Sequence, residues 1–200
     1  MTQDDVRKFR LRSSLQVKET ATDLPRVLLL HDSTMNKVNP KRLALSYGLH
    51  VAARRAYTIH SIKRVAEEAS EDLQPAPDCV VLHTGINDLK GKDPVTCGKD
   101  MASAVKSVQK IFPQAHLVCS KATPVKSQHM EAKRVLYNAH TFSETIEGNV
   151  KNVSYVAYEN IKGPQHLRDD LHPNDQGARL LAGNLGRHLH RLFWERPRRK

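Results

Sequence analysis

Short apolar runs alternate with amphipathic segments along most of this chain, and this alternation constrains the fold more than any other feature. The stretches 26–31, 78–83 and 115–119 are almost continuously apolar, which is typical of strands buried on both faces. Two weaker strand-like segments lie at residues 50–54 and 153–157. Apolar residues at helical spacing lie between and after the strands, over residues 40–47, 59–69, 95–112, 131–146 and 174–193. The alternation predicts an α/β domain with a mainly parallel sheet and helices on both faces.

The size of the chain is that of one domain. Its 200 residues are 39% hydrophobic and 26% charged, which is a globular composition, and no apolar run approaches the ~20 residues that span a bilayer. We expect a basic, flexible arm at residues 1–24, a folded domain at 25–193 and a basic tail at 194–200.

The cysteines and the N-terminal residues indicate a cellular compartment. The three cysteines, Cys79, Cys97 and Cys119, are widely spaced and form no Cys-x-x-Cys pair, so we expect neither a disulfide framework nor a zinc site. The first residues contain no apolar stretch typical of a secretory signal. The expected location is therefore intracellular, in the cytoplasm or the nucleus.

The charge of the chain is strongly positive, at +11 from 32 Lys and Arg against 21 Asp and Glu. Such a balance favours a nucleic acid or an anionic membrane surface as partner, and a merely soluble surface is the alternative interpretation. Aromatic residues make up only 5%, so a base-stacking platform is not indicated. His188 and His190 face different sides of a predicted helix, so we expect no metal site.

Three polar segments carry side chains suited to ester hydrolysis. Asp32-Ser33-Thr34 follows the predicted strand at 26–31, and Gly85-Ile86-Asn87-Asp88 follows the one at 78–83. Asp169 precedes His172 by three residues. The carboxyl ends of parallel strands are where sheets of this kind place their ligand sites. Each segment taken alone is more readily explained as an ordinary turn or helix cap.

Together the segments supply the groups of a serine esterase that needs no cofactor. Ser33 is the candidate nucleophile and His172 the candidate base. Asp169 can orient the imidazole, with Asp170 as the competing carboxylate. The amide of Asn87 can donate to a developing oxyanion.

These segments resemble the blocks of the SGNH (GDSL-type) hydrolase superfamily over about residues 26–193. The resemblance implies a flavodoxin-like three-layer α/β/α fold and a small ester or lipid substrate. It implies Ser33, Asp169 and His172 as catalytic residues, and Asn87 with the Ser33 backbone N–H as oxyanion donors. Asp32, Gly85 and Asp88 are the supporting residues of the matching blocks.

The chain departs from the family pattern at two positions. His31 replaces the usual glycine before Asp32, and is either a substrate contact or a strand-end residue with a satisfied hydrogen bond. The second-block glycine is missing, and Ala56 is the best match for it as a backbone oxyanion donor. Arg54 and Arg55 lie beside this position, where they could contact an anionic substrate or a phosphate.

A narrower resemblance concerns the esterase-type domains of first-open-reading-frame proteins of animal LINE retrotransposons. It rests on residues 30–34, 81–89 and 182–187. The principal hypothesis is a serine esterase or deacetylase acting through an acyl-serine intermediate. The alternatives are a binding module for nucleic acid or an anionic membrane surface with little turnover, and a protein-interaction domain that uses the 1–24 arm.

Overall fold

A single parallel sheet organises the molecule. The computed structural model describes residues 24–195, so the predicted basic arm up to residue 23 and the predicted tail beyond Glu195 lie outside the described residues. The sheet has five strands in the order β2-β1-β3-β4-β5, and every neighbouring pair is parallel. The strands are β1 (Arg26–His31), β2 (His50–Arg55), β3 (Cys79–His83), β4 (His116–Ser120) and β5 (Val153–Val156).

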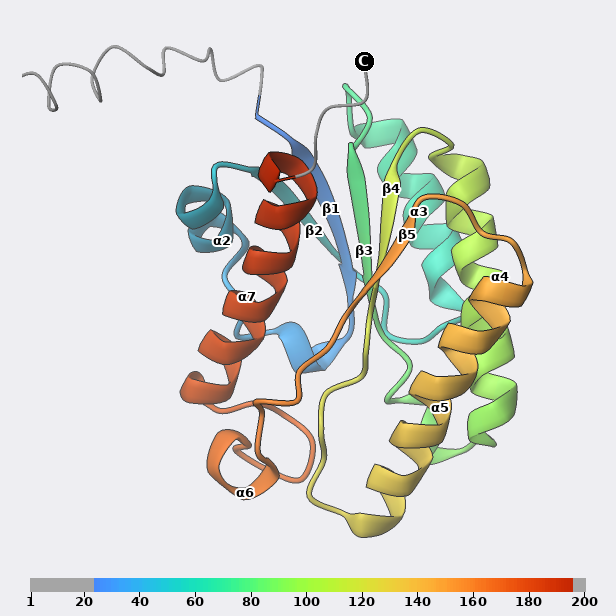
Figure 1. Ribbon diagram of the computed structural model, residues 1–200, viewed down its shortest axis with the longest axis vertical. Coiled ribbons are helices and arrows are strands. Elements are labelled where there is room, and N and C mark those ends of the chain that lie inside the picture. Colours follow the sequence, from blue (N-terminus) through green and yellow to red (C-terminus); the bar gives the residue numbers. More distant parts are fainter. Residues whose placement is uncertain (1–23, 196–200) are drawn as a thin grey trace, which may run out of the picture.

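Helices cover both faces of this sheet, which confirms the predicted three-layer α/β/α architecture (Figure 1). One face is covered by α2 (Pro40–Tyr47) and α7 (Asp175–His190). The other is covered by α3 (Ser61–Asp72), α4 (Pro94–Ile111) and α5 (Gln128–Glu147). Side chains alternate along β1, so Leu29 packs on the α7 side and Leu28 on the α4 side. This two-sided burial explains why the strand is apolar without interruption.

Three short elements were not predicted, because each is too short to show a helical period. They are the 3₁₀ helices η1 (Ser33–Met35) and η2 (Asp88–Lys90) and the single turn α6 (Gly163–His166). The final turn η3 (Arg191–Glu195) lies partly within the helix predicted at 174–193. The longer predicted helices are present with shifted ends. The helix predicted at 131–146 begins earlier, at Gln128, because the Ser127 hydroxyl accepts from the Met130 N–H and caps it.

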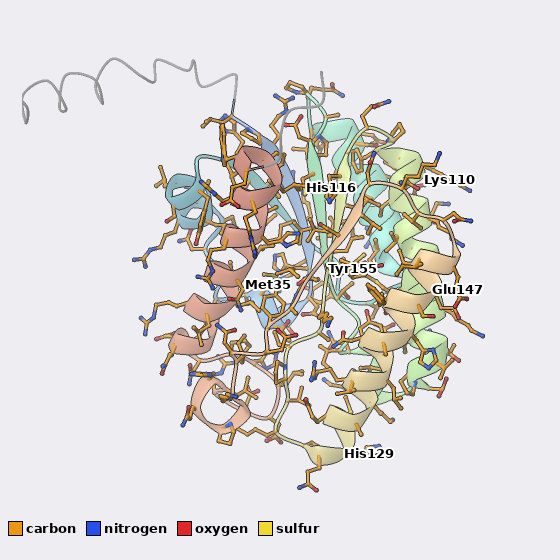
Figure 2. The ribbon with its side chains drawn as sticks, in the orientation of Figure 1. Met35, Lys110, His116, His129, Glu147 and Tyr155 are labelled. Carbon is orange, nitrogen blue, oxygen red and sulfur yellow. The ribbon has the colours of Figure 1, made fainter. Side chains whose placement is uncertain are left out.

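The strand order reverses its direction at β1, and we call the region outside the carboxyl ends of β1 and β3 the crevice. From β1 the chain passes to β2 on one side of it and then to β3 on the other, and sheets of this kind place their ligand sites at such a reversal. Met35 lies just beyond the carboxyl end of β1, whereas His116, the first residue of β4, lies at the amino ends of the strands (Figure 2). No helix within residues 24–195 is both long and apolar enough to cross a membrane.

Candidate active site

Ser33, His172 and Asp169 lie in one hydrogen-bonded line. Ser33 Oγ is 3.0 Å from His172 Nε2, and His172 Nδ1 is 3.0 Å from Asp169 Oδ2. The carboxylate can only accept, so Nδ1 carries the proton and Nε2 presents its lone pair to the serine hydroxyl. The arrangement therefore suits removal of a proton from Ser33 by His172.

The Asp169 carboxylate holds both the imidazole and the turn that carries it. Its Oδ1 accepts from the backbone N–H groups of His172 at 2.7 Å and Leu171 at 2.9 Å. These backbone hydrogen bonds, followed by the contact with the His172 ring, lower the pKa of Asp169 well below its usual range. The neighbouring Asp170 instead uses its carbonyl, which accepts from the Lys126 N–H. The carboxylate that contacts the histidine is thus that of Asp169.

Ser33 is positioned by the 3₁₀ turn that follows β1. Asp32 caps this turn, and its buried carboxylate accepts from both the N–H and the hydroxyl of Thr34. Burial raises the pKa of Asp32. Within the described residues, the backbone N–H of Ser33 donates no hydrogen bond. That N–H remains available to a bound oxyanion.

Asn87 lies on the other side of the crevice, directly before η2. One of its amide hydrogens goes to the Tyr57 carbonyl, at 3.0 Å, which leaves the second free to donate. The turn before it requires Gly85, whose φ is +114° and where a Cβ would collide with the Tyr137 ring. Asp88 accepts from the Ile59 N–H and so ties this turn to the loop after β2.

The structure corrects the expectation for Ala56. Its backbone N–H donates to the His31 carbonyl at 2.9 Å as a continuation of the β1–β2 ladder. An N–H already donated inside the sheet cannot also hold an oxyanion. The next residue, Tyr57, has an N–H with no partner among the described residues, and its carbonyl contacts Asn87. Sequence reasoning chose Ala56 and not Tyr57, because it looked for a small residue in place of the missing second-block glycine.

The structure separates the two arginines that follow one another in β2. Successive side chains of a strand point to opposite faces. Arg54 points toward α3, where its guanidinium lies 3.9 Å from the Asp72 carboxylate. Arg55 contacts Asn36 and Tyr57 on the side of the crevice. His31, the register partner of Arg55, has its Nδ1 2.8 Å from the Asp32 carbonyl.

A buried polar chain runs beneath Ser33 from strand to strand. Thr34 Oγ1 lies 2.9 Å from His83 Nε2, His83 Nδ1 lies 2.5 Å from Ser120 Oγ, and Ser120 Oγ lies 2.6 Å from the Tyr158 hydroxyl. Burial lowers the pKa of His83 to about 3, so the ring is neutral. In the sequence, the sign of this polar network is that two apolar strands end in polar residues, His83 and Ser120.

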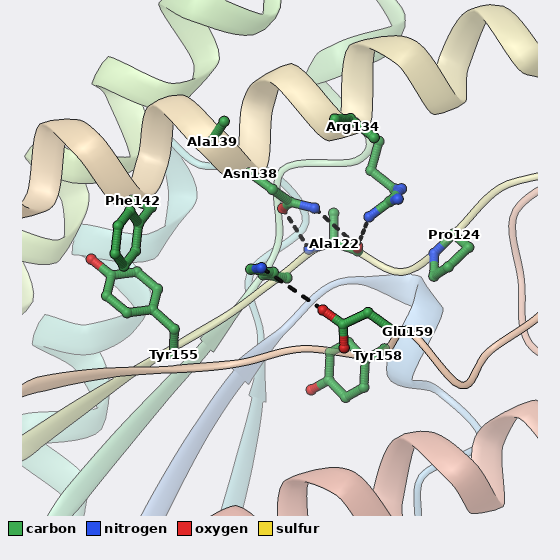
Figure 3. Close-up of a pocket in the computed structure, with 11 residues that line it drawn as sticks. Ala122, Pro124, Arg134, Asn138, Ala139, Phe142, Tyr155, Tyr158 and Glu159 are labelled. Atoms are coloured by element: carbon green, nitrogen blue, oxygen red, sulfur yellow. Dashed lines mark hydrogen bonds and ion pairs between the residues drawn. The ribbon is translucent and has the colours of Figure 1, made fainter.

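A cavity of about 440 Å³ lies between α5 and the segment after β5 (Figure 3). Phe142 and Tyr155 form an edge-to-face pair in its wall, and Arg134 and Asn138 bond to the backbone of Ala122. None of the predicted site residues lines it. Within residues 24–195, no group of three or more histidine, cysteine or acidic side chains is arranged to hold a metal ion.

Comparison with known proteins gives a consistent family. The profile of the GDSL-like lipase/acylhydrolase family matches residues 31–180. A search of curated protein sequences finds no match. Three similar solved structures, each 16% identical to this chain, are a carbohydrate esterase family 3 protein from Talaromyces cellulolyticus, a lipolytic G-D-S-L family member from Veillonella parvula and the esterase EstA from a Pseudoalteromonas species. Their TM-scores are 0.68, 0.66 and 0.64, and the matches cover 87%, 86% and 84% of this chain and 100%, 99% and 97% of theirs.

Proposed function

Because the chain belongs to the GDSL-like lipase/acylhydrolase family, we propose that it hydrolyses a carboxylic ester through an acyl-serine intermediate formed on Ser33. The hydrogen-bonded line from Ser33 through His172 to Asp169 supports this proposal most strongly. Its members come from the two ends of the domain, and Ser33 and His172 are only partly buried, so the hydroxyl and the imidazole that meet there are within reach of a substrate. The proposed substrate is a small ester or a lipid. An acetylesterase is the narrower form of this proposal.

The groups that act in the first half of the reaction lie on two sides of the crevice. His172 Nε2 takes the Ser33 proton as Ser33 Oγ attacks the ester carbonyl, and Asp169 stabilises the imidazolium that forms. Asn87 and the N–H groups of Ser33 and Tyr57 donate to the oxyanion.

The second half of the reaction uses the same groups. His172 returns the proton to the leaving alkoxide, so the alcohol departs and the acyl group stays on Ser33. Water then loses a proton to His172 and attacks the acyl-serine. The acid is released, and Ser33 recovers its proton from His172. No cofactor enters this sequence of steps.

Replacement of Ser33 tests the proposal. We expect Ser33→Ala to reduce hydrolysis of 4-nitrophenyl acetate to background, while the free energy of unfolding changes by less than ~0.5 kcal/mol because Ser33 is only half-buried. A fluorophosphonate should label the wild type on Ser33, as located by mass spectrometry. A folded Ser33→Ala variant with full activity, or a label on another residue, would refute the assignment.

The narrower resemblance to LINE retrotransposon proteins and a nucleic-acid or anionic-surface partner both stay predictions. Nine of the 32 Lys and Arg residues that suggested such a partner lie at residues 7–18 and 196–200, outside the described residues.

A further inference from the structure

We propose that Arg55 makes the site selective for esters that carry an anionic group, a carboxylate or a phosphate, near the scissile bond. The inference rests on the proposed ester hydrolysis at Ser33 and names a substrate class for it.

Arg55 is held at the edge of the crevice between the serine turn and the oxyanion side. It is the last residue of β2, and Nη2 donates to Asn36 Oδ1 at 2.8 Å. Asn36 caps η1, and its N–H bonds to the Ser33 carbonyl. The other terminal nitrogen, Nη1, donates to the Tyr57 hydroxyl at 3.0 Å. The guanidinium therefore bridges two residues that adjoin Ser33 and Asn87.

The charge of Arg55 is not neutralised by the protein. Its two side-chain partners are an amide and a phenol, and no carboxylate among residues 24–195 lies within ion-pairing distance of it. Two cations that flank the serine turn and the histidine turn are, by contrast, paired: Lys37 with Asp175, and Arg168 with Asp169. An exposed guanidinium without an anion is free to contact one that the substrate brings.

The geometry of Arg55 is suited to recognition rather than to charge alone. The guanidinium lies over the Tyr57 ring, 5.5 Å from its centroid, and its two hydrogen bonds restrict the side chain further. Of its five N–H donors, three remain for a ligand. Because a guanidinium can bind two anionic oxygens at once, a preorganised one favours a carboxylate or phosphate over a neutral group.

Arg54 provides a control for this role. It is the preceding residue and carries the same charge, but it points to the other face of the sheet toward Asp72. A non-specific effect of positive charge would involve both arginines, whereas direct contact with the substrate involves only Arg55.

The test compares matched pairs of esters that differ only in charge. One pair places a carboxylate on the acyl side, the mono-4-nitrophenyl ester of adipic acid against its methyl ester. The second places a phosphate on the alcohol side, 1-acetylglycerol 3-phosphate against 1-acetylglycerol. For the wild type we expect kcat/KM to be about 10- to 100-fold higher for the anionic member of at least one pair. The pair that shows the preference identifies the side on which the anion is bound.

The variants assign this preference to a residue. Arg55→Met should bring the anionic and neutral esters close to equal, Arg55→Lys should retain part of the preference, and Arg54→Met should retain all of it. The ratio between paired esters separates lost recognition from a general disturbance of the site, because a disturbed site slows both members. Circular dichroism and melting temperature check that each variant is folded.

Two results overturn the inference, and they are distinguishable. Equal kcat/KM within both pairs for the wild type, or a preference that survives in Arg55→Met, removes the role of Arg55 and leaves the esterase intact. Turnover of 4-nitrophenyl acetate with no turnover of any of the four esters also removes the role of Arg55 and leaves the esterase intact. Absence of Ser33-dependent turnover of all five esters refutes the proposed function and this inference with it.

Discussion

Asp169 shows how a single carboxylate sets both the position and the chemistry of a histidine. It accepts hydrogen bonds from two backbone N–H groups of its own turn and from the His172 ring. The turn therefore cannot relax without moving the imidazole. The same contacts favour the ionised carboxylate, which in turn fixes the tautomer that presents Nε2 to Ser33.

Substitution of the two adjacent aspartates distinguishes their roles. We expect Asp169→Asn to lower kcat for 4-nitrophenyl acetate on the order of 10³- to 10⁴-fold, because an amide in that place favours the wrong tautomer of His172. Asp170→Asn is the matched control, and it should retain nearly full activity since the Asp170 contact is made by a backbone carbonyl. A larger loss in Asp170→Asn than in Asp169→Asn would contradict the assignment of the orienting carboxylate.

At the scale of elements, the site depends on short turns fixed from within the domain. The turn before Asn87 passes through Gly85 at a positive φ, and the Tyr137 hydroxyl donates to the neighbouring Thr84 carbonyl at 2.9 Å. Tyr137 belongs to α5, so a helix on one face of the sheet supports the oxyanion side of the crevice.

Glycine substitutions measure this support. Gly85→Ala should lower the free energy of unfolding by about 1–3 kcal/mol, because an L side chain is strained at that φ and the added Cβ meets Tyr137. Gly91, five residues beyond Ile86, has a negative φ and open space around it, so Gly91→Ala should be neutral or slightly stabilising. Urea unfolding of both variants gives the comparison, and equal stabilities would argue against strain at Gly85.

The strands and the longer helices could be predicted from the sequence, but their contacts could not. Strand and helix positions follow from runs of apolar residues, and those patterns are visible in one dimension. Strand register decides that the Ala56 N–H is used inside the sheet and which of Arg54 and Arg55 lies on the side of the crevice. Register follows from packing between elements far apart in the chain, and the sequence pattern left it open.

At the scale of the whole molecule, the buried polar chain links three strands under the crevice. Its members follow or end β1, β3 and β4, with Tyr158 beyond β5. If Asp32 is ionised, each group in turn donates one hydrogen bond toward it, from Tyr158 through Ser120, His83 and Thr34. Every hydrogen bond in this polar chain is then donated in the same direction, toward Asp32. This requires His83 to accept at Nδ1 and therefore to stay neutral.

Acid should therefore weaken the fold through His83. Its pKa is about 3 in the folded protein and near 6.5 when unfolded, so between these values the unfolded state binds one more proton. Stability is full above pH 6.5 and falls as the pH drops, by about 1 kcal/mol between pH 6.5 and 5.5. Burial raises the pKa of Asp32, which acts in the opposite direction.

Comparison with a variant isolates the histidine from the other titrating groups. Urea unfolding at pH 6.5 and 5.5 should show a drop in stability that is about 1 kcal/mol smaller in His83→Gln than in the wild type. The variant will be less stable at both pH values, because it disturbs a buried network. Equal drops in the two proteins would mean that His83 does not remain neutral in the fold.

The hydrogen bond between Ser33 and His172 joins residues 139 positions apart, and this separation has a consequence for synthesis. During translation Ser33 emerges before Asn87 and His172, and all five strands have left the ribosome before Asp169 does. A nascent chain halted there has the whole sheet available but lacks the histidine and the α7 layer that covers one face. Closing so long a loop is entropically costly until the surrounding core exists. Turnover would thus report that translation has passed α7 and that the domain has folded.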